Sequence, residues 1–342
     1  MRIAIHKSED GFHKRWISYC QNRNIEYQIV NCYDNDIIKQ LENFDALLWH
    51  HSHSKPRDIL FAKQLLFSLE QSGLTVFPDF NTGWHFDDKV GQKYLLEAID
   101  APLVGSHVFY SKKDALHWVE RTTFPKVFKL RGGSGSANVK LVKTRSEAIK
   151  YIKKAFGKGF RQYEPLTNLK ERWRKYRNGL TDLKDVCKGV LRFYKEPEFS
   201  KTIGYERGYV YFQDFIPNND FDIRVIVIGK RAFALKRMVR AGDFKASGSG
   251  HMKFAKEEFD KRCIKIAFTT NKKLNAQCLA YDFVFDKNDV PLIVEVSFGF
   301  AVEAYDSCPG YWDENLVWHE GNFIPQEWMI EDLLLLIKEK NE

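Results

Sequence analysis

Short apolar stretches alternate with stretches of helical spacing over the first hundred residues. Strands are predicted at residues 3–5, 27–30, 46–49 and 75–77, and helices near residues 13–23 and 58–72. This alternation indicates a small α/β domain with a mostly parallel sheet. Ligands of such sheets bind at the carboxyl ends of the strands, so we expect polar residues after the third strand to face a ligand.

Two similar strand-and-helix units open the next segment. Ser111 with Asp114, and Thr144 with Glu147, have the spacing of capping boxes and predict helix starts. Between these units, a strand leads into the glycine-rich residues 131–136 and then into another strand, so a hairpin loop is predicted. No Gly-Lys-Ser/Thr follows and no helix begins there, which excludes a Walker loop and a dinucleotide fingerprint.

The last third of the chain is rich in strands. They are predicted at residues 209–212, 223–228, 232–238, 279–285 and 292–296, with hairpin turns at 229–230 and 287–289. Helical spacing is found at residues 257–270 and 326–338. The chain as a whole is therefore expected to have an α+β fold.

The composition is that of an ordinary globular protein. The 342 residues are 44% hydrophobic and include 27 Phe, 15 Tyr and 8 Trp, so disordered and fibrous classes are excluded.

No apolar run approaches the roughly 18 residues of a membrane span. The six cysteines form no CxxC pair, and no apolar leader follows Met1, so we expect isolated thiols in a reducing cytoplasm.

Positive charge is concentrated in one segment. The formal net charge is +8, and residues 153–207 contain fifteen Lys or Arg against seven Asp or Glu. A nucleic-acid-binding surface would spread its charge more widely, so that class is disfavoured. The basic segment predicts either a local anionic partner or a solvated insertion.

Two acidic residues lie in late strands that are otherwise apolar. Asp282 and Glu295 belong to two strands joined by a predicted turn. Buried carboxylates are costly unless a cation pairs with them, and two neighbours also repel each other. A divalent cation removes both costs, and oxygen ligands favour Mg²⁺ or Mn²⁺. The alternative is that both residues lie on the solvated face of an edge hairpin.

Several further residues are typical of phosphate or nucleotide binding. Lys129 precedes the glycine-rich loop, whose backbone N–H groups can surround phosphates. Lys89 follows Asp88 near a predicted domain junction. Residues 211–217 form an extended segment that can pair with an adenine edge, and Asp222 can accept from ribose hydroxyls. A structural role is the alternative for each of them.

Three histidines follow the third predicted strand. His50, His51 and His53 stand where an α/β domain binds its ligand. They are interpreted as polar residues that face a substrate, as a metal site, or as a plain surface loop.

The order of these elements resembles the ATP-grasp superfamily, in particular the RimK-like carboxylate–amine ligase branch that includes the ribosomal S6 modification enzyme. The matching segments are 88–89, 124–135, 212–216, 222–229, 236–247, 282 and 295–297. The resemblance implies an ATP-grasp fold behind a Rossmann-like domain at 1–105. The lid subdomain would span 106–210, with the basic insertion at about 157–208, and the large subdomain 211–342.

The resemblance also implies the residues of the active site. Those that would bind ATP are Lys89, Lys129, Gly133, Ser134, Gly135, Gln213, Asp214, Phe215, Ile216, Asp222 and Lys245. Those that would hold Mg²⁺, or Mn²⁺, are Asp282, Glu295 and Ser297. Lys129 and Arg237 would be catalytic, with Arg237 facing the reacting carboxyl group.

Two features depart from the family pattern. Ser297 stands where the family usually has Asn, and a hydroxyl is a weaker metal ligand than an amide carbonyl. The 85 positions from Lys129 to Asp214 exceed the expected spacing, and the basic segment accounts for the excess.

The function implied is an ATP-dependent ligase that forms an amide through an acyl phosphate. Its partners would be an acid, an amino-acid-like amine and an anionic polymer at the basic insertion, such as an acidic glycan or peptide. The acidic residues 303, 306, 313 and 314 are expected to bind the amine. The alternatives are an ATP-grasp kinase and a non-catalytic protein that binds nucleotide or nucleic acid.

Overall fold

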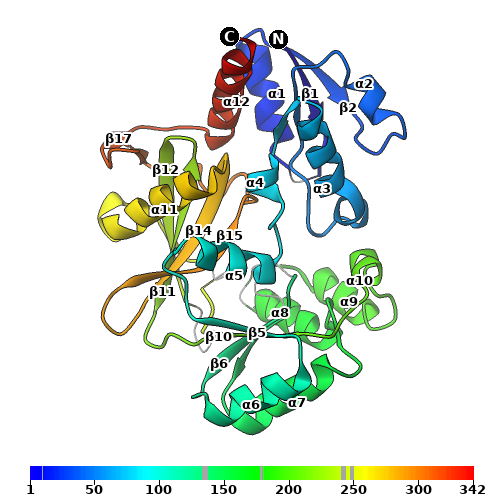
Figure 1. The fold of residues 1–342 in the computed structure, drawn as a ribbon, viewed down its shortest axis with the longest axis vertical. Helices are drawn as coiled ribbons and strands as arrows, with labels where there is room; N and C mark the ends of the chain where they lie inside the picture. Colours follow the sequence, from blue (N-terminus) through cyan, green and yellow to red (C-terminus); the bar gives the residue numbers. More distant parts are fainter. Residues whose placement is uncertain (10, 133–137, 178, 180, 240–243, 247–249) are drawn as a thin grey trace. The chain divides into compact units, whose positions relative to one another are not determined.

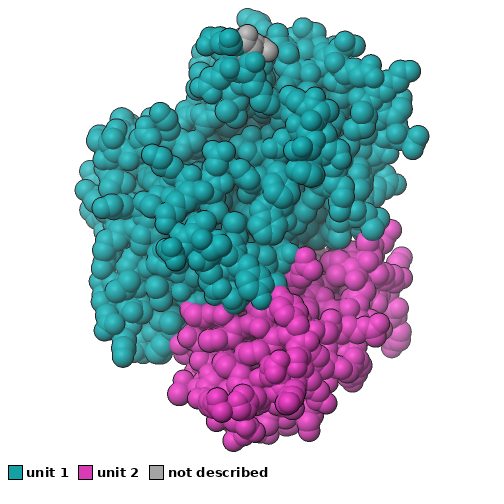
Figure 2. Space-filling model, viewed as in Figure 1, with its two compact units in different colours: residues 1–104, 216–342 teal, residues 105–215 magenta. Residues whose placement is uncertain are grey.

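The structure is a computed structural model that describes the chain except residues 10, 133–137, 178, 180, 240–243 and 247–249. Its residues form two compact units (Figure 2). One unit contains Met1–Val104 and Ile216–Glu342, and the other contains Gly105–Phe215. In the described part of the chain, no helix is long and apolar enough to cross a membrane.

The N-terminal part of the first unit is built on a parallel sheet (Figure 1). Its strands are β1 (Arg2–His6), β2 (Glu26–Val30), β3 (Ala46–Leu48) and β4 (Thr75–Phe77), in the order β2-β1-β3-β4. The intervening helices are α1 (His13–Asn22), α2 (Ile37–Gln40), α3 (Pro56–Gln71) and α4 (Phe80–Gly83). Every strand pair is parallel, which confirms the α/β arrangement predicted from the alternating pattern.

An antiparallel sheet forms the second part of the same unit. Its strands are β11 (Phe221–Ile228), β12 (Arg231–Met238), β13 (Met252–Lys253), β14 (Cys278–Phe285), β15 (Pro291–Ser297), β16 (Gly310–Asp313) and β17 (Trp318–Glu320). The order is β15-β14-β11-β12-β16-β17, and β13 pairs with β12. Both predicted hairpins, β11–β12 and β14–β15, are present.

Helices cover this large sheet. They are α5 (Lys89–Ala98), the 3-10 turn η1 (Lys256–Glu258), α11 (Lys261–Leu274) and α12 (Pro325–Asn341), which packs against α1. Helix α11 begins later than predicted because η1 precedes it and the Asp260 carboxylate caps its N-terminus. Alternating side chains of β11 place Val225 in the core beside α11 and Ile226 in the core shared with α1 and α12, so both faces are buried.

The smaller unit has an antiparallel sheet in the order β5-β10-β6-β7. Its strands are β5 (Ser106–Phe109), β6 (Lys126–Lys129), β7 (Val139–Val142) and β10 (Val210–Asp214). Helices α6 (Lys112–Arg121) and α7 (Arg145–Ala155) cover one face, and the Ser111 and Thr144 hydroxyls cap them as predicted. Phe128 points to these helices, so Lys129, the next residue along the strand, points to the opposite face.

The basic segment folds into helices of its own. A short pair of strands, β8 (Phe160–Arg161) and β9 (Tyr205–Glu206), brackets α8 (Pro165–Arg177), α9 (Leu183–Leu191) and α10 (Glu198–Ile203). Helices α8 and α9 pack together, and the Arg172 guanidinium pairs with the Asp185 carboxylate between them.

Candidate functional site

Four charged side chains form an ion-pair cluster on the central strands of the large sheet. Asp222 lies opposite Arg237 across β11 and β12, and Arg224 lies opposite Asp282 across β11 and β14. Positions 222 and 224 are two apart in one strand, so their side chains share a face. Because opposed side chains of antiparallel strands touch, the register alone brings the four groups together.

Guanidinium groups bind both oxygens of each carboxylate in this cluster. Arg237 donates to Asp222 through Nε at 2.6 Å and Nη2 at 2.7 Å. Arg224 donates to Asp282 through Nε at 2.6 Å and Nη2 at 2.8 Å. Arg237 Nη2 also lies 2.8 Å from Asp282 Oδ2. With two carboxylates and two guanidinium groups, the ion-pair cluster has no net charge.

The arginines determine the protonation of Asp282. Burial alone would raise the pKa of its carboxyl, but Arg224 and Arg237 outweigh burial and hold this pKa well below its usual range. Asp282 is therefore a carboxylate at neutral pH. Removing one arginine would leave buried negative charge without compensation, which is strongly destabilising.

Glu295 lies next to the ion-pair cluster, opposite Asp282 on β15, and its side chain is 30% exposed. Lys89, the first residue of α5, places Nζ 3.9 Å from Glu295 Oε1. Ser297 ends β15, and its hydroxyl accepts from the Gly299 N–H at 3.2 Å and donates to the Gly299 carbonyl at 3.0 Å. The Ser297 hydroxyl therefore stabilises the turn that follows the strand.

The donor chemistry of Asp282 and Glu295 fits a hard divalent cation, because two carboxylates meet across one strand pair. The predicted third ligand, the Ser297 hydroxyl, is engaged by its own turn instead. Among the described residues, no group of three or more His, Cys, Asp or Glu side chains is arranged to hold a metal ion. Oxygen atoms from a bound molecule, such as phosphate oxygens, would have to complete the coordination of the cation.

A second group of predicted site residues lies on the smaller unit. Lys129 is 5% exposed, and its Nζ donates to Gln213 Oε1 at 2.7 Å across β6 and β10. Gln213 Nε2 donates in turn to the Ser106 hydroxyl at 3.1 Å. These side chains share the sheet face that α6 and α7 leave uncovered. Lys129 is thus a buried cation that donates to a neutral amide.

The predicted adenine hinge coincides with the boundary between the two units, which falls between Phe215 and Ile216. The Asp214 carboxylate is engaged by His107 at 3.3 Å and by Lys126 at 2.6 Å. The hydrogen bond with His107, together with Lys126, lowers the pKa of Asp214 to about 2 despite partial burial. Asp214 therefore stabilises the end of β10 with its side chain, and its N–H donates to the Gly105 carbonyl at 2.7 Å.

Three of the predicted phosphate-binding residues, Gly133, Ser134 and Gly135, lie outside the described residues. Lys245 is described, is half-buried, and lies over the ring of Phe244.

Buried imidazoles line the carboxyl end of the parallel sheet in the first unit. Nitrogen atoms of His6, His13, His50, His51 and His85 are buried without a hydrogen-bond partner among the described residues. His6 Nδ1 accepts from the Cys32 N–H at 3.0 Å, so its proton is on Nε2, which faces no acceptor. Such groups are rare in folded proteins, and they indicate a place that a ligand or water satisfies.

Burial keeps these imidazoles neutral. It lowers the pKa of His50 to about 3 and of His85 to about 4, and it lowers the pKa of His51 well below its usual value. His53 also has a lowered pKa through burial, and Asp87, Lys89 and Glu295 all act on it electrostatically. The histidines after β3 therefore extend toward the Glu295 side chain.

The loop after β15 packs directly on this histidine cluster. Phe298 contacts the rings of His50 and His51, and a Cβ at Gly299 would lie only 3.2 Å from His50 Nε2. Glycine at position 299 is thus what allows the loop to approach His50.

The acidic residues proposed to bind an amine do not gather at one point. Asp306 pairs with Arg15 at 2.6 Å, and Glu314 pairs with Lys230 at 3.3 Å. Asp313 accepts from His319 at 3.0 Å, and Glu303 is exposed. Two of these four carboxylates are therefore compensated by cations of the chain itself.

Sequence reasoning missed the contribution of Arg224 to this site. The sequence feature that could have identified Arg224 is its spacing from Asp222. The two residues are two positions apart in one strand, so their opposite charges lie on the same face. His6 and His85 were also missed, because they join the histidine cluster from other parts of the chain.

Comparisons with known proteins agree with this architecture. Residues 189–308 match the model of the RimK-like ATP-grasp domain. No curated protein matches the chain in sequence.

Solved structures of similar fold cover nearly the whole chain. A RimK-domain ATP-grasp protein from Sphaerobacter thermophilus has a TM-score of 0.55 at 15% identity, covering 98% of this chain and 100% of that one. D-alanine–D-alanine ligase from Bacillus anthracis has a TM-score of 0.52 at 15% identity, covering 99% of each chain. The ATP-grasp ligase PsnB, solved with a precursor peptide and AMPPNP, has a TM-score of 0.52 at 11% identity, covering 98% of each chain.

Proposed function

The chain has the ATP-grasp fold with a RimK-like domain at residues 189–308, and from this premise we propose that it is an ATP-dependent carboxylate–amine ligase. The single observation that carries the proposal is the ion-pair cluster of Asp222, Arg224, Arg237 and Asp282 beside Glu295. It supplies buried charges of both signs where the family resemblance expects the triphosphate and the reacting carboxylate.

The proposed reaction starts from a carboxylate, which is a poor electrophile because its leaving group would be hydroxide. Transfer of the ATP γ-phosphoryl group gives an acyl phosphate, and attack by an amine then releases phosphate and forms the amide. The chain must stabilise the negative charge that develops on the phosphoryl oxygens. Lys129 and Lys89 are the buried cations that we assign to this task, and Arg237 is assigned to the carboxyl group.

The ion-pair cluster is suited to exchange its partners. Arg224 and Arg237 both bind Asp282, so one arginine can turn to a phosphate or carboxylate oxygen while the other still compensates Asp282. If Arg224 turns, Arg237 still pairs with Asp222 and Asp282, so both buried carboxylates stay paired. If Arg237 turns, Asp222 loses its guanidinium pair, and binding of the substrate carboxylate must offset that cost. Asp282 and Glu295 would hold Mg²⁺, which lowers the charge on the phosphates and acts as a Lewis acid.

The acid substrate is proposed to be large and anionic, and the basic insertion would bind it. PsnB shows that a protein of this fold holds a peptide together with a nucleotide analogue. The excess of lysine and arginine in residues 153–207 is complementary to such a substrate if it is acidic.

The test is ADP release by the full chain with Mg²⁺, against a panel of amino acids combined with acidic peptides and glycans, followed by mass spectrometry. Ligase activity predicts ADP release that depends on both the acid and the amine, with a product whose mass equals their sum less one water. A stable phosphorylated product would instead identify a kinase. ADP release without either product would refute both.

A non-catalytic nucleotide-binding role is the second candidate. The observation that favours it is the engagement of both Asp282 oxygens by arginines and of the Ser297 hydroxyl by its turn. This role predicts tight ATP binding in calorimetry with no turnover for any pair of substrates.

A further inference from the structure

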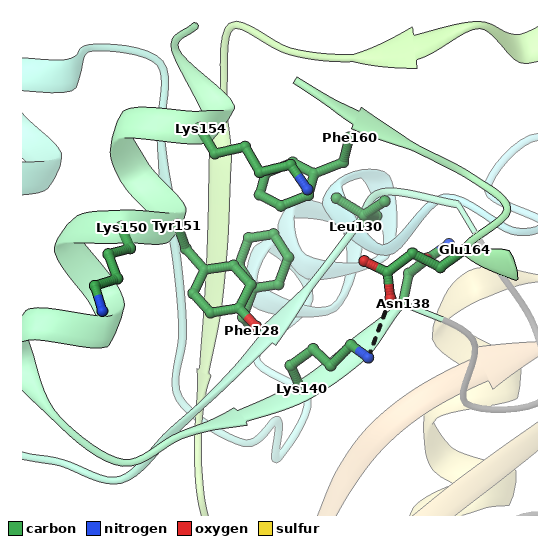
Figure 3. Close-up of a pocket in the computed structure, with 9 residues that line it drawn as sticks. All are labelled: Phe128, Leu130, Asn138, Lys140, Lys150, Tyr151, Lys154, Phe160 and Glu164. Carbon is green, nitrogen blue, oxygen red and sulfur yellow. Dashed lines mark ion pairs between the residues drawn. The ribbon is translucent and has the colours of Figure 1, made fainter. Parts of the chain in front are cut away.

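A hollow with a volume of about 180 Å³ lies on the smaller unit (Figure 3). Sites for whole small ligands are larger, about 300–1,000 Å³, so this hollow fits a single side chain or a group of similar size. Its lining comes from β6, β7, α7, β8 and the segments next to them, up to the entry to α8. The lining residues are Phe128, Leu130, Asn138, Lys140, Lys150, Tyr151, Lys154, Phe160 and Glu164. We call it the lysine–aromatic pocket.

The pocket is separate from the predicted nucleotide residues. Phe128 and Leu130 line it, whereas Lys129 stands between them in the same extended segment. Side chains alternate along a strand, so Lys129 points to the other face of the sheet. A ligand in the pocket would therefore not compete with a nucleotide at Lys129.

Aromatic rings form the floor of the pocket. The rings of Phe128 and Tyr151 have centroids 4.5 Å apart, and those of Phe128 and Phe160 are 5.0 Å apart. The rings of Tyr151 and Phe160 are stacked with an interplanar angle of 13°. A floor of this kind binds an apolar group, because burying apolar surface is favourable and aromatic pairs contribute further.

Lysines stand around this floor, as Figure 3 shows. Lys154 lies over the Phe160 ring at 4.3 Å, and Lys150 stands one turn before it on α7. Neither lysine makes an ion pair with the described residues of the chain. Like charges at positions i and i+4 of a helix repel by about 0.2–0.5 kcal/mol, so an anion bound beside either group would be stabilised.

The pocket's own acid compensates only part of this charge. Glu164 Oε2 lies 3.3 Å from Lys140 Nζ and accepts from the Thr167 hydroxyl at 2.7 Å, and Glu164 also interacts electrostatically with Lys154. Three lysines thus line the pocket with one carboxylate, which leaves an excess of two positive charges. The ligand must combine an apolar group with carboxylates or a comparable negative charge.

An extended ligand would continue from the pocket onto the helical insertion. Lys140 Nζ also donates to the Thr167 hydroxyl in the first turn of α8, at 3.1 Å. Helix α8 carries Trp173, which is 50% exposed, and beyond α9 Tyr194 is 90% exposed. The helical insertion that follows Glu164 therefore carries exposed aromatic side chains as well as the excess of Lys and Arg.

We propose that the lysine–aromatic pocket binds an acidic peptide segment, with one apolar side chain on the aromatic floor and neighbouring carboxylates on Lys150 and Lys154. The proposal rests on the proposed function, since it names the class of the anionic substrate. It adds an anchoring point on the sheet face opposite Lys129.

The test uses fluorescence anisotropy of the full chain without ATP. The probes are fluorescein-labelled peptides with Phe, Tyr or Leu between two pairs of glutamates, and the same peptide with Ala at the centre. The variant is Lys150→Glu with Lys154→Glu. The control is Lys153→Glu with Lys158→Glu, which changes the charge equally at exposed positions on or just after α7 that do not line the pocket.

The proposal predicts that the pocket variant weakens peptide binding at least about tenfold, which equals about 1.4 kcal/mol, while the control stays within about threefold. The Ala peptide should also bind several-fold more weakly than the best of the other three. The proposal is overturned if none of the three peptides binds, if both double variants lose binding equally, or if the Ala peptide binds as well as the others. Binding of a single-stranded oligonucleotide but not of the peptides would also overturn it and would indicate a nucleic-acid surface.

The two proposals fail separately in this design. Peptide binding that follows the pocket variant, without any ADP-forming ligation, would refute the proposed function and leave the pocket assignment standing. Amide formation with small acids, without peptide binding, would refute the pocket assignment alone.

Discussion

Mild acid should destabilise the first unit through its buried histidines. His51 and His85 are at most 3% exposed, and burial holds the pKa of His85 at about 4 and that of His50 at about 3. In the unfolded chain these imidazoles have a pKa near 6.5. Below pH 6.5 the unfolded state therefore binds protons that the folded state does not bind, so the stability falls as the pH falls.

The size of this effect follows from the number of such groups. A group that is protonated only in the unfolded state changes the free energy of unfolding by up to about 1.4 kcal/mol per pH unit. Three histidines, His50, His51 and His85, would together give a slope approaching about 4 kcal/mol per pH unit between about pH 6 and pH 4. Asp79, whose pKa burial raises to about 6, binds its proton in the folded state first and would offset about one group's share of this slope. The Asp214 carboxyl, with a pKa of about 2, contributes to the stability of the fold until the pH falls below about 4. It therefore does not change the slope between pH 6 and pH 4.

The assay is urea unfolding followed by tryptophan fluorescence at intervals from pH 7.5 to pH 4.5. We expect the urea midpoint to fall below pH 6.5, and His85→Leu should reduce the slope by up to about 1.4 kcal/mol per pH unit, the share of one such group. The control is His117→Gln, whose side chain is 56% exposed and whose removal should leave the slope unchanged. A flat midpoint between pH 7 and pH 5, or equal slopes for the two variants, would refute the reasoning.

Three further predictions concern the candidate site. Lys129→Met should lower ADP formation by about 10²–10³-fold by removing a stabilising charge, and ADP formation within threefold of the parent would contradict its role. Arg237→Met should lower the free energy of unfolding by about 3–5 kcal/mol, and the loss should be smaller when Asp222→Asn is added; equal losses in chemical denaturation would disprove the coupling. Glu295→Gln should raise the Mg²⁺ concentration needed for half-maximal ADP formation, whereas Ser297→Asn should lower it, and an unchanged Mg²⁺ requirement for Glu295→Gln would exclude it as a ligand.

Local patterns in the sequence were enough to predict much of the fold. The β11–β12 and β14–β15 hairpins and the helix starts at Ser111 and Thr144 depend on residues that are close in sequence. The glycine-rich segment was also predicted to join two strands, and β6 and β7 do pair on either side of it. In each case the turn residues and the alternation of apolar side chains that determine the structure lie within about ten residues of each other. Contacts between residues distant in sequence therefore do little to change these elements.

The partners of Asp282 were not predictable in the same way. Asp282 lies in β14, which follows α11 in the chain and pairs with β11. The pairing of Arg224 with Asp282 depends on the register of these two strands, which is fixed by packing across the whole sheet. A shift of one residue would point Arg224 into the apolar core beside α11. The sequence showed that Asp282 needs a cation, but only the three-dimensional pairing shows that two arginines lie within reach.

The distribution of buried polar groups favours function over stability as the reason for both clusters. Replacing a buried ion pair by apolar residues of similar volume is often neutral or stabilising, so stability alone does not explain Asp222, Arg224, Arg237 and Asp282. Buried imidazole nitrogens without partners cost free energy as well. Both features occur in the first unit, on either side of Glu295, while the cores around them are apolar. Departures from ordinary packing that converge in this way are typical of sites that act on a ligand.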